Sequence, residues 1–187
     1  MRKGHLFVIS GPSGAGKGTI LKKAMPQIDD IAYSISCTTR VPRAEDKEGV
    51  TYYFLSKEEF SRMAENGEFL EWAEVHGNCY GTRKKTVLDE LEKGRDIILE
   101  IDVQGALQVK DVYPEAITIF IVPPTFEILK ERLVGRATEA ESDLKLRLEN
   151  AGTEISYKDK YDKVVINDNL ERAVSEFIEL VKDFRRK

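Results

Sequence analysis

The chain has 187 residues, of which 41% are hydrophobic and 33% charged, proportions of an ordinary globular protein with one domain or a core with inserted lobes. Its 29 basic and 33 acidic residues give a net charge of −4, which argues against broad, non-specific binding to nucleic acid, because such binding needs a basic face. Cys37 and Cys79 form no C-x-x-C pair and only two histidines accompany them, which argues against a zinc site and favours two reduced thiols.

The amino-terminal segment MRKGHLFVIS has a basic start, but its apolar run is shorter than the central region of a signal peptide. No apolar stretch approaches the ~20 residues that a membrane-spanning helix needs. We therefore expect a cytoplasmic protein with neither membrane nor nucleic acid as a partner.

The first half of the chain is predicted to begin with a buried strand over residues 6–9, followed by the turn Gly11-Pro12. A helix is expected from Lys17 to Met25, where Pro26 stops it. Ser56 and Glu59 form a capping-box pattern that starts another helix, which Gly67 ends. Strands are expected at 31–37, 52–55 and 69–75.

The second half predicts helices at 84–93, 103–112, from Thr125 onward, and at 142–157, and strands at 96–102, 116–122 and 163–166. Asp168 or Asn169 is expected to cap the last helix. This alternation of strand and helix predicts an α/β fold whose parallel sheet is flanked by helices. Residues 34–82 break the alternation with several short strands and one helix, so they predict an inserted α+β lobe.

The most informative motif is Gly11-Pro-Ser-Gly-Ala-Gly16-Lys17, which matches the G-x-x-x-x-G-K core of a P-loop between a predicted strand and a predicted helix. Its backbone N–H groups form a nest for phosphate oxygens, and the helix that follows adds the partial positive charge of its N-terminus. The residues expected to bind the phosphates are Gly11, Pro12, Ser13, Gly14, Ala15, Gly16, Lys17, Gly18 and Thr19.

Gly18 departs from the usual P-loop, which has Ser or Thr after the lysine to hold Mg²⁺. Thr19 follows one place later. We therefore expect no certain protein ligand for the metal, and a Mg²⁺ ion held mainly by phosphates and water.

A second set of polar residues begins with Ser36-Cys-Thr-Thr-Arg40-Val-Pro-Arg43, in which two arginines three residues apart can make bidentate contacts to one phosphate. The blocks FLEWAEVHGNCYGT (residues 69–82) and LEIDVQGA (residues 99–106) follow. With these motifs the sequence resembles the guanylate kinase family, and the resemblance extends from the P-loop to Asn167-Asp168.

The resemblance implies transfer of a phosphoryl group from ATP to GMP and divides the chain into three parts. These are a P-loop core (1–33, 83–124 and 156–187), a GMP-binding lobe (34–82) and a helical lid (125–155). It implies that Arg40, Arg43, Tyr52 and Tyr80 hold the GMP phosphate, with Gly81 beside them. Ser36, Glu71 and Thr82 are implied as the readers of the guanine base.

Elementary chemistry supports the implied role of Glu71. Guanine presents N1–H and N2–H₂ side by side, and an ionised carboxylate accepts from both. Adenine has an unprotonated N1 at that edge, which would repel the carboxylate. A polar site of this kind rejects the wrong base strongly because the mismatch leaves buried groups unpaired.

Glu100 and Asp102 are predicted to point to the same face of one strand, at its C-terminal end, where open α/β sheets bind ligands. We expect one to order the water shell of Mg²⁺ and the other to contact GMP or a loop, with the division of roles open. In the lid, the resemblance implies that Arg132, Arg136 and Arg147 clamp the transferring phosphoryl group. Asn167 and Asp168 lie near the expected position of adenine.

Two other functions fit parts of the pattern. One is a scaffold domain that keeps the fold and lacks activity, although Lys17 and the arginines argue against it. The other is a P-loop kinase that acts on a different monophosphate.

Overall fold

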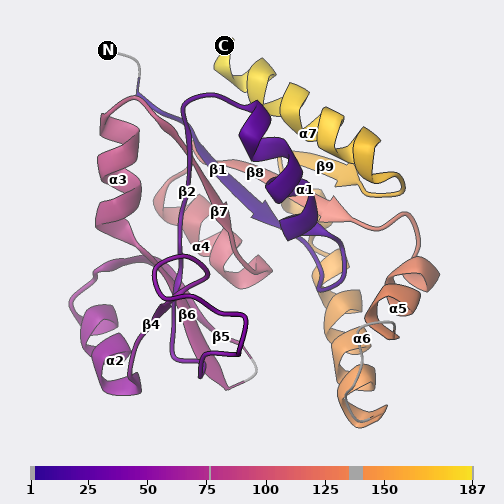
Figure 1. The fold of residues 1–187 in the computed structure, drawn as a ribbon, viewed down its shortest axis with the longest axis horizontal. Coiled ribbons are helices and arrows are strands. Elements are labelled where there is room, and N and C mark those ends of the chain that lie inside the picture. The colour runs from indigo at the N-terminus through magenta and orange to yellow at the C-terminus, as the bar shows by residue number, and fades with distance from the viewer. Residues whose placement is uncertain (1–2, 76, 135–140, 187) are drawn as a thin grey trace. The chain divides into compact units, whose positions relative to one another are not determined.

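The strands form two sheets in a computed structural model that describes residues 3–75, 77–134 and 141–186 (Figure 1). The five-stranded sheet contains, in order, β2 (Ile31–Tyr33), β7 (Asp96–Glu100), β1 (Leu6–Ser10), β8 (Ile117–Val122) and β9 (Lys163–Ile166). The four-stranded sheet contains, in order, β4 (Tyr53–Phe54), β3 (Cys37–Thr38), β6 (Asn78–Arg83) and β5 (Phe69–Val75). The predicted α/β fold with a parallel sheet flanked by helices is confirmed.

The chain divides into two compact units. The first unit comprises Met1–Val8 and Asp30–Ile117, and the second comprises Ile9–Asp29 and Thr118–Lys187. The helices of the first unit are α2 (Lys57–Glu65), α3 (Lys84–Glu92) and α4 (Val103–Val112). Those of the second are α1 (Lys17–Ala24), α5 (Phe126–Val134), α6 (Glu141–Ile155) and α7 (Leu170–Arg185), with 3₁₀ turns at Met25–Gln27 and Lys158–Lys160.

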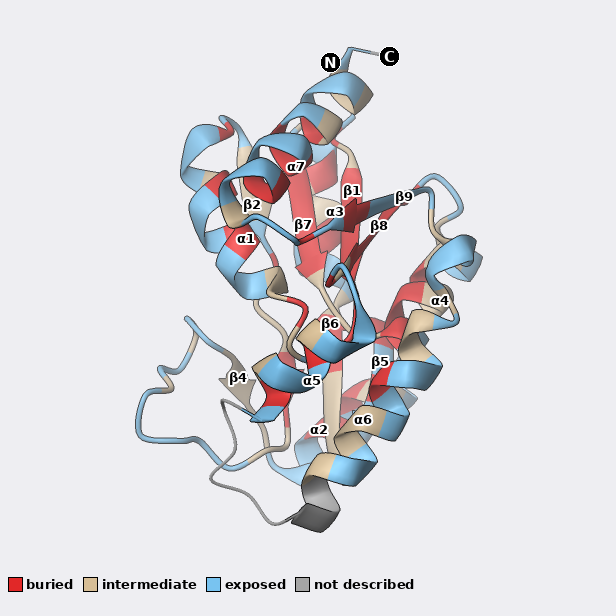
Figure 2. Ribbon diagram, turned by 90° about the vertical axis from the view of Figure 1, so that its right-hand side faces the viewer, coloured by how far each residue is buried: buried red, intermediate tan, exposed pale blue. Residues whose placement is uncertain are grey.

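The three central strands of the larger sheet, β7, β1 and β8, carry much of the core, and Figure 2 shows them largely in the colour of buried residues. All five residues of β1 are buried, and so are Ile97, Ile98 and Leu99 of β7. Burial of these apolar side chains supplies the main driving force for folding. In the second unit α7 packs against α1 (Figure 1), and its residues Phe177 and Val181 are fully buried.

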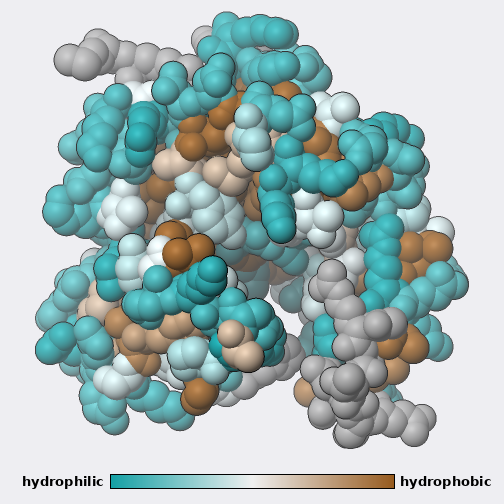
Figure 3. Space-filling view, viewed as in Figure 1, coloured by the Kyte–Doolittle hydropathy of each residue, from teal (hydrophilic) through white to brown (hydrophobic). Residues whose placement is uncertain are grey.

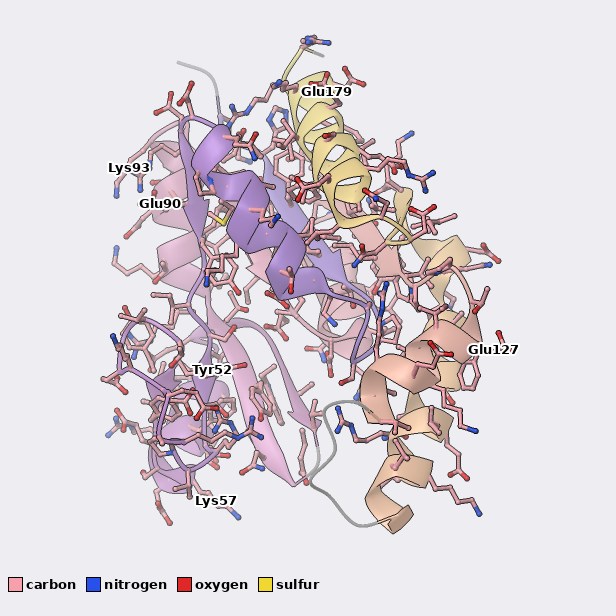
Figure 4. The ribbon with its side chains drawn as sticks, turned by 45° about the vertical axis from the view of Figure 1, so that its right-hand side comes forward. Tyr52, Lys57, Glu90, Lys93, Glu127 and Glu179 are labelled. Atoms are coloured by element: carbon pink, nitrogen blue, oxygen red, sulfur yellow. The ribbon has the colours of Figure 1, made fainter. Side chains whose placement is uncertain are left out.

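Capping residues set the starts of two helices as the sequence patterns predict. Ser56 Oγ accepts a hydrogen bond from the N–H of Glu59 at 3.0 Å and begins α2. Asn169, rather than Asp168, caps α7 by accepting from the N–H of Arg172. Figure 4 labels Glu90 and Lys93 near the end of α3, where their side chains form an ion pair at 2.9 Å.

The single strand predicted over 31–37 is wrong. The chain leaves the larger sheet after β2 and enters the smaller one at β3, and the N–H of Ser34 still donates to the Ile98 carbonyl as it leaves. The strand β6 has no counterpart among the specific sequence predictions. It pairs antiparallel with β5, so the two strands form a hairpin. From the sequence alone this stretch is identified only as part of the block at residues 69–82.

Hydrophobic residues on the face drawn in Figure 3 lie as separate patches among hydrophilic ones. No helix in the described ranges combines the length and apolar character that a bilayer crossing requires.

Candidate active site

The P-loop connects the end of β1 to the start of α1, as predicted. Gly11, Gly14 and Gly16 have φ angles of 142°, 84° and 91°, a region that residues with a Cβ rarely adopt. Space also demands glycine here: a Cβ on Gly11 would lie 2.0 Å from the Ile121 carbonyl oxygen. Gly18 and Thr19 lie in the first turn of α1, whose N-terminus carries no acidic residue and so keeps its attraction for anions.

The ammonium group of Lys17 lies against the loop. Its Nζ donates to the carbonyl oxygens of Gly11 at 2.6 Å and of Pro12 at 3.2 Å. These contacts hold the positive charge beside the ring of backbone N–H groups, where phosphate oxygens would gather.

Asn167 is a buried residue that connects three parts of the second unit, and its contacts were not foreseen from the sequence. Its side chain Nδ2 donates to the Ala15 carbonyl at 2.8 Å, and its backbone N–H donates to the Val122 carbonyl. Its own carbonyl accepts from Arg132 Nη2 at 2.9 Å. A Cβ on Gly16 would lie 2.4 Å from Asn167 Nδ2, so the close approach of this amide requires glycine there.

A cavity of about 520 Å³ adjoins the P-loop in the second unit. It is lined by Gly14, Gly16, Thr19, Arg132, Asn167, Asp168 and Leu170. Arg147 Nη2 donates to Ser13 Oγ at 3.2 Å, so two of the three predicted lid arginines contact the P-loop or a residue bound to it. The third, Arg136, lies outside the described residues.

In the first unit, Arg40 is held by an acidic residue that sequence reasoning missed. Arg40 Nη2 donates to Asp46 Oδ2 at 2.9 Å, and the same oxygen accepts from the N–H of Arg43 at 2.7 Å. The side chain of Asp46 is only 7% exposed. The hydrogen bond from the Arg43 backbone and the charge of Arg40 hold the pKa of Asp46 below its usual value.

Aromatic rings surround the Arg40 guanidinium. It lies 5.4 Å from the centre of the Tyr52 ring and 5.8 Å from that of Phe54. Tyr52, labelled in Figure 4, meets Tyr80 edge to face at 5.9 Å. The structure therefore brings together the predicted phosphate-holding residues Arg40, Tyr52 and Tyr80, while the side chain of Arg43 is exposed.

Glu71 lies on β5 and is 5% exposed, an unusual environment for a carboxyl group. Its Oε1 accepts from Thr82 Oγ1 at 2.6 Å, across the pair that β5 forms with β6. Burial raises the pKa of Glu71 to about 7, although the Thr82 hydrogen bonds lower it; the nearby charge of Asp102 raises it further. The predicted readers Glu71 and Thr82 are therefore in contact.

The prediction for Asp102 is wrong in one respect, because β7 ends at Glu100 and Asp102 is not part of the strand. Asp102 instead caps α4, accepting from the N–H of Gly105 at 2.7 Å. An aspartate directly before a helix is a common cap, and this preference ends the strand early. Glu100 accepts from the Tyr33 hydroxyl at 3.0 Å, a contact that involves a residue not foreseen from the sequence.

The two remaining residues predicted to bind GMP are Ser36 and Gly81. Ser36 is half-buried between β2 and β3, and its carbonyl accepts from the N–H of Tyr53. Gly81 pairs with Trp72 across β5 and β6, and a Cβ there would lie 3.0 Å from the Phe69 ring and 3.1 Å from the Phe60 ring. Gly81 therefore leaves room for these two rings in the core of the lobe. It lies on β6 between Tyr80 and Thr82.

Three comparisons with known proteins agree. A family profile described as guanylate kinase matches residues 3–184. The chain is 46% identical over 185 residues to a guanylate kinase of Thermotoga maritima, covering 99% of this chain and 89% of the relative. It is 52% identical over 173 residues to that of Caldanaerobacter subterraneus, covering 92% and 84%. A crystal structure of guanylate kinase from Anaplasma phagocytophilum matches with a TM-score of 0.83 and 34% identity, covering 100% of this chain and 88% of that one.

Proposed function

The chain belongs to the guanylate kinase family, and we propose that its two units divide the reaction between donor and acceptor. The enzyme transfers the γ-phosphate of ATP to GMP and produces ADP and GDP. In our proposal the second unit binds ATP through the P-loop, and the first unit binds GMP.

The donor assignment depends on the loop from Gly11 to Thr19 and on the cations beside it. Backbone N–H groups and Lys17 hold the β- and γ-phosphates. Arg132 and Arg147, together with Arg136, carry the positive charge that stabilises the transferring group. The cavity next to the loop, with Asn167 and Asp168 in its wall, accommodates the adenosine.

The acceptor assignment depends on the two clusters in the first unit. Arg40, Arg43, Tyr52 and Tyr80 hold the phosphate of GMP. Glu71 accepts from guanine N1–H and N2–H₂, while the hydroxyl of Ser36 donates to guanine O6, and that of Thr82 does so when it turns away from Glu71. The single observation that carries this proposal is the buried carboxylate of Glu71 in contact with Thr82. We expect dGMP to react too, because these contacts reach only the base and the phosphate.

The acceptor needs no general base. A phosphate monoester has its second pKa near 6, so its attacking oxygen is mostly deprotonated at pH 7. Catalysis then consists of positioning and charge stabilisation. Arg40 and Arg43 hold an anion that ATP would otherwise repel.

A Mg²⁺ ion bound with ATP would neutralise phosphate charge. The residues near the P-loop suit it, because Thr19, which carries a hydroxyl oxygen, lines the cavity and hard oxygen ligands are those that Mg²⁺ prefers. Among the described residues no three His, Cys, Asp or Glu side chains are grouped to hold a metal. We therefore propose that phosphates and water provide most of the ligands, with Glu100 or Asp102 acting on the water shell.

We further propose that the 34–82 lobe and the 125–155 lid move relative to the P-loop core and exclude water around the two nucleotides. Water left in the site would hydrolyse ATP. We place the reaction in the cytoplasm, where ATP and GMP are available. Solution scattering with and without both nucleotides tests the closure, and identical profiles would refute it.

An acceptor panel tests the proposed specificity. ADP release is measured with GMP, dGMP, AMP, CMP and UMP, and we expect turnover with the two guanine nucleotides only. Glu71→Ala should raise the KM for GMP and reduce base selectivity while the KM for ATP stays constant. An unchanged KM and selectivity in that variant would refute the role of Glu71.

A further inference from the structure

Helix α4 presents three residues, spaced by three positions, toward the strand that carries Glu71. They are Asp102, Gly105 and Gln108, which share one face of the helix because of this spacing. Asp102 is the helix cap, and its charge acts on Glu71. The other two have no part in the proposed chemistry, yet each makes a close approach to Glu71 or to its neighbour in the chain.

Gly105 lies directly beneath the Glu71 carboxylate. A Cβ at this position would lie 2.4 Å from Glu71 Oε2 and 3.1 Å from Glu71 Cδ, closer than real atoms approach. Gly105 is not among the residues with positive φ, so its backbone conformation does not demand glycine. Alanine is the better residue inside a helix, which means that the space for the carboxylate explains the glycine.

Gln108 holds the backbone of the residue that follows Glu71. Its Nε2 donates to the Trp72 carbonyl at 2.9 Å, and its Oε1 accepts from the Trp72 N–H at 3.3 Å. Strand β5 is the edge strand of its sheet, so these two peptide groups have no neighbouring strand on that side. The amide of Gln108 takes the place of that strand.

The register of β5 makes such support necessary. The pairing between β5 and β6 shifts register between Phe69 and Glu71, as it does at a β-bulge or a similar irregularity. Bulges re-aim side chains and weaken the local ladder. Glu71 therefore starts from an irregular stretch of backbone, and its carboxylate is fixed by Thr82 on one side and by α4 on the other.

We infer that α4 sets the position of the base-reading carboxylate, with Gly105 and Gln108 as positioning residues for guanine selectivity. This inference rests on the proposed role of Glu71. Both oxygens of a carboxylate must meet N1–H and N2–H₂ at once, and such bidentate recognition tolerates only about 0.5 Å of displacement. Gly105 provides the room for this placement, and Gln108 fixes the backbone from which the side chain extends.

Gly105→Ala tests the first half of the inference, with Gly152→Ala as the matched control. Gly152 is an exposed glycine inside helix α6, and a Cβ there would meet no atom nearer than 4.0 Å. We expect Gly105→Ala to raise the KM for GMP by roughly tenfold or more and to lower the GMP-to-AMP ratio of kcat/KM, as displacement near 1 Å does. The KM for ATP should stay constant, and Gly152→Ala should change none of these values.

Gln108→Ala tests the second half, and Gln104→Ala is its control. Gln104 is the same residue type, exposed on the same helix. Loss of both hydrogen bonds to Trp72 should raise the KM for GMP about threefold to tenfold. A factor of this size corresponds to the net free energy of one or two ordinary hydrogen bonds. Gln104→Ala should behave as the parent enzyme.

These measurements separate the inference from the assignment on which it rests. If Glu71→Ala loses selectivity while Gly105→Ala and Gln108→Ala both keep it, the role of α4 is refuted and that of Glu71 stands. If Glu71→Ala also keeps selectivity, the proposed guanine site itself is wrong. Melting temperatures are measured for every variant, and should Gly105→Ala unfold, Gln108→Ala against Gln104→Ala decides.

Discussion

Replacing Glu71 by glutamine should stabilise the substrate-free protein above pH 7 while it weakens the binding of GMP. The carboxyl group is 5% exposed and accepts from Thr82, a hydrogen bond that the carbonyl of glutamine can also accept. Burial is the main reason that its pKa rises from 4.5 to about 7. Ionisation of this group is therefore disfavoured in the folded protein relative to the unfolded chain.

The size of the effect follows from this difference in pKa. Each unit corresponds to about 1.4 kcal/mol, so the ionised Glu71 costs the folded state up to about 3 kcal/mol. Below pH 4.5 the carboxyl group is neutral in both states and costs nothing. The cost grows between pH 4.5 and about 7 and is constant above that range, because the folded protein binds more protons than the unfolded chain only within it.

Urea unfolding of the parent and of Glu71→Gln between pH 5 and 8.5 measures this cost. The difference in unfolding free energy should grow with pH and reach a plateau above pH 7, while a parallel titration shows weaker GMP binding by the variant. Glu74→Gln on the same strand is the control, since Glu74 is exposed and its difference should stay flat. A constant difference for Glu71→Gln across the range would refute the argument from burial.

Three further variants test other contacts of the two units. Asn167→Ala removes a buried donor and should raise the KM for ATP by roughly tenfold or more without changing the KM for GMP; equal effects on both substrates would contradict its role at the P-loop. Asp46→Asn should raise the KM for GMP about tenfold because a charge-assisted hydrogen bond is lost, whereas Glu45→Gln, a charge change of the same size next to it, should have no effect on either substrate. Gly16→Ala should abolish ATP binding measured by calorimetry and keep the helical circular dichroism spectrum; retained binding would show that the loop tolerates a Cβ.

Local patterns carried enough information to predict the larger sheet and several helix starts. The run at 6–9 with Gly11-Pro12 placed β1 and the P-loop, and Ser56 with Glu59 placed the start of α2. These features depend on neighbours in the sequence, where capping and turn preferences act. The smaller sheet was harder to predict because two-residue strands such as β3 have no periodicity to detect.

Contacts between distant parts of the chain escaped prediction for a physical reason. Asn167 meets Ala15 across 152 positions, and Gln108 meets Trp72 across 36, and no local pattern encodes either pairing. The role of Asp102 could have been predicted from the sequence, since an aspartate just before a predicted helix often caps that helix. This preference competes with its inclusion in the strand. Asp46 follows the two arginines closely, but only the folded loop shows that its carboxylate binds one of them.

The amide of Asn167 has a consequence for the order in which the protein becomes competent during synthesis. The phosphate loop contains Ala15, yet the donor for the Ala15 carbonyl lies 152 positions further along the chain, directly after β9. A ribosome must therefore advance 152 positions beyond Ala15 before this contact can form. A growing chain that ends before Asn167 therefore lacks the amide that holds the Ala15 carbonyl beside the phosphate loop.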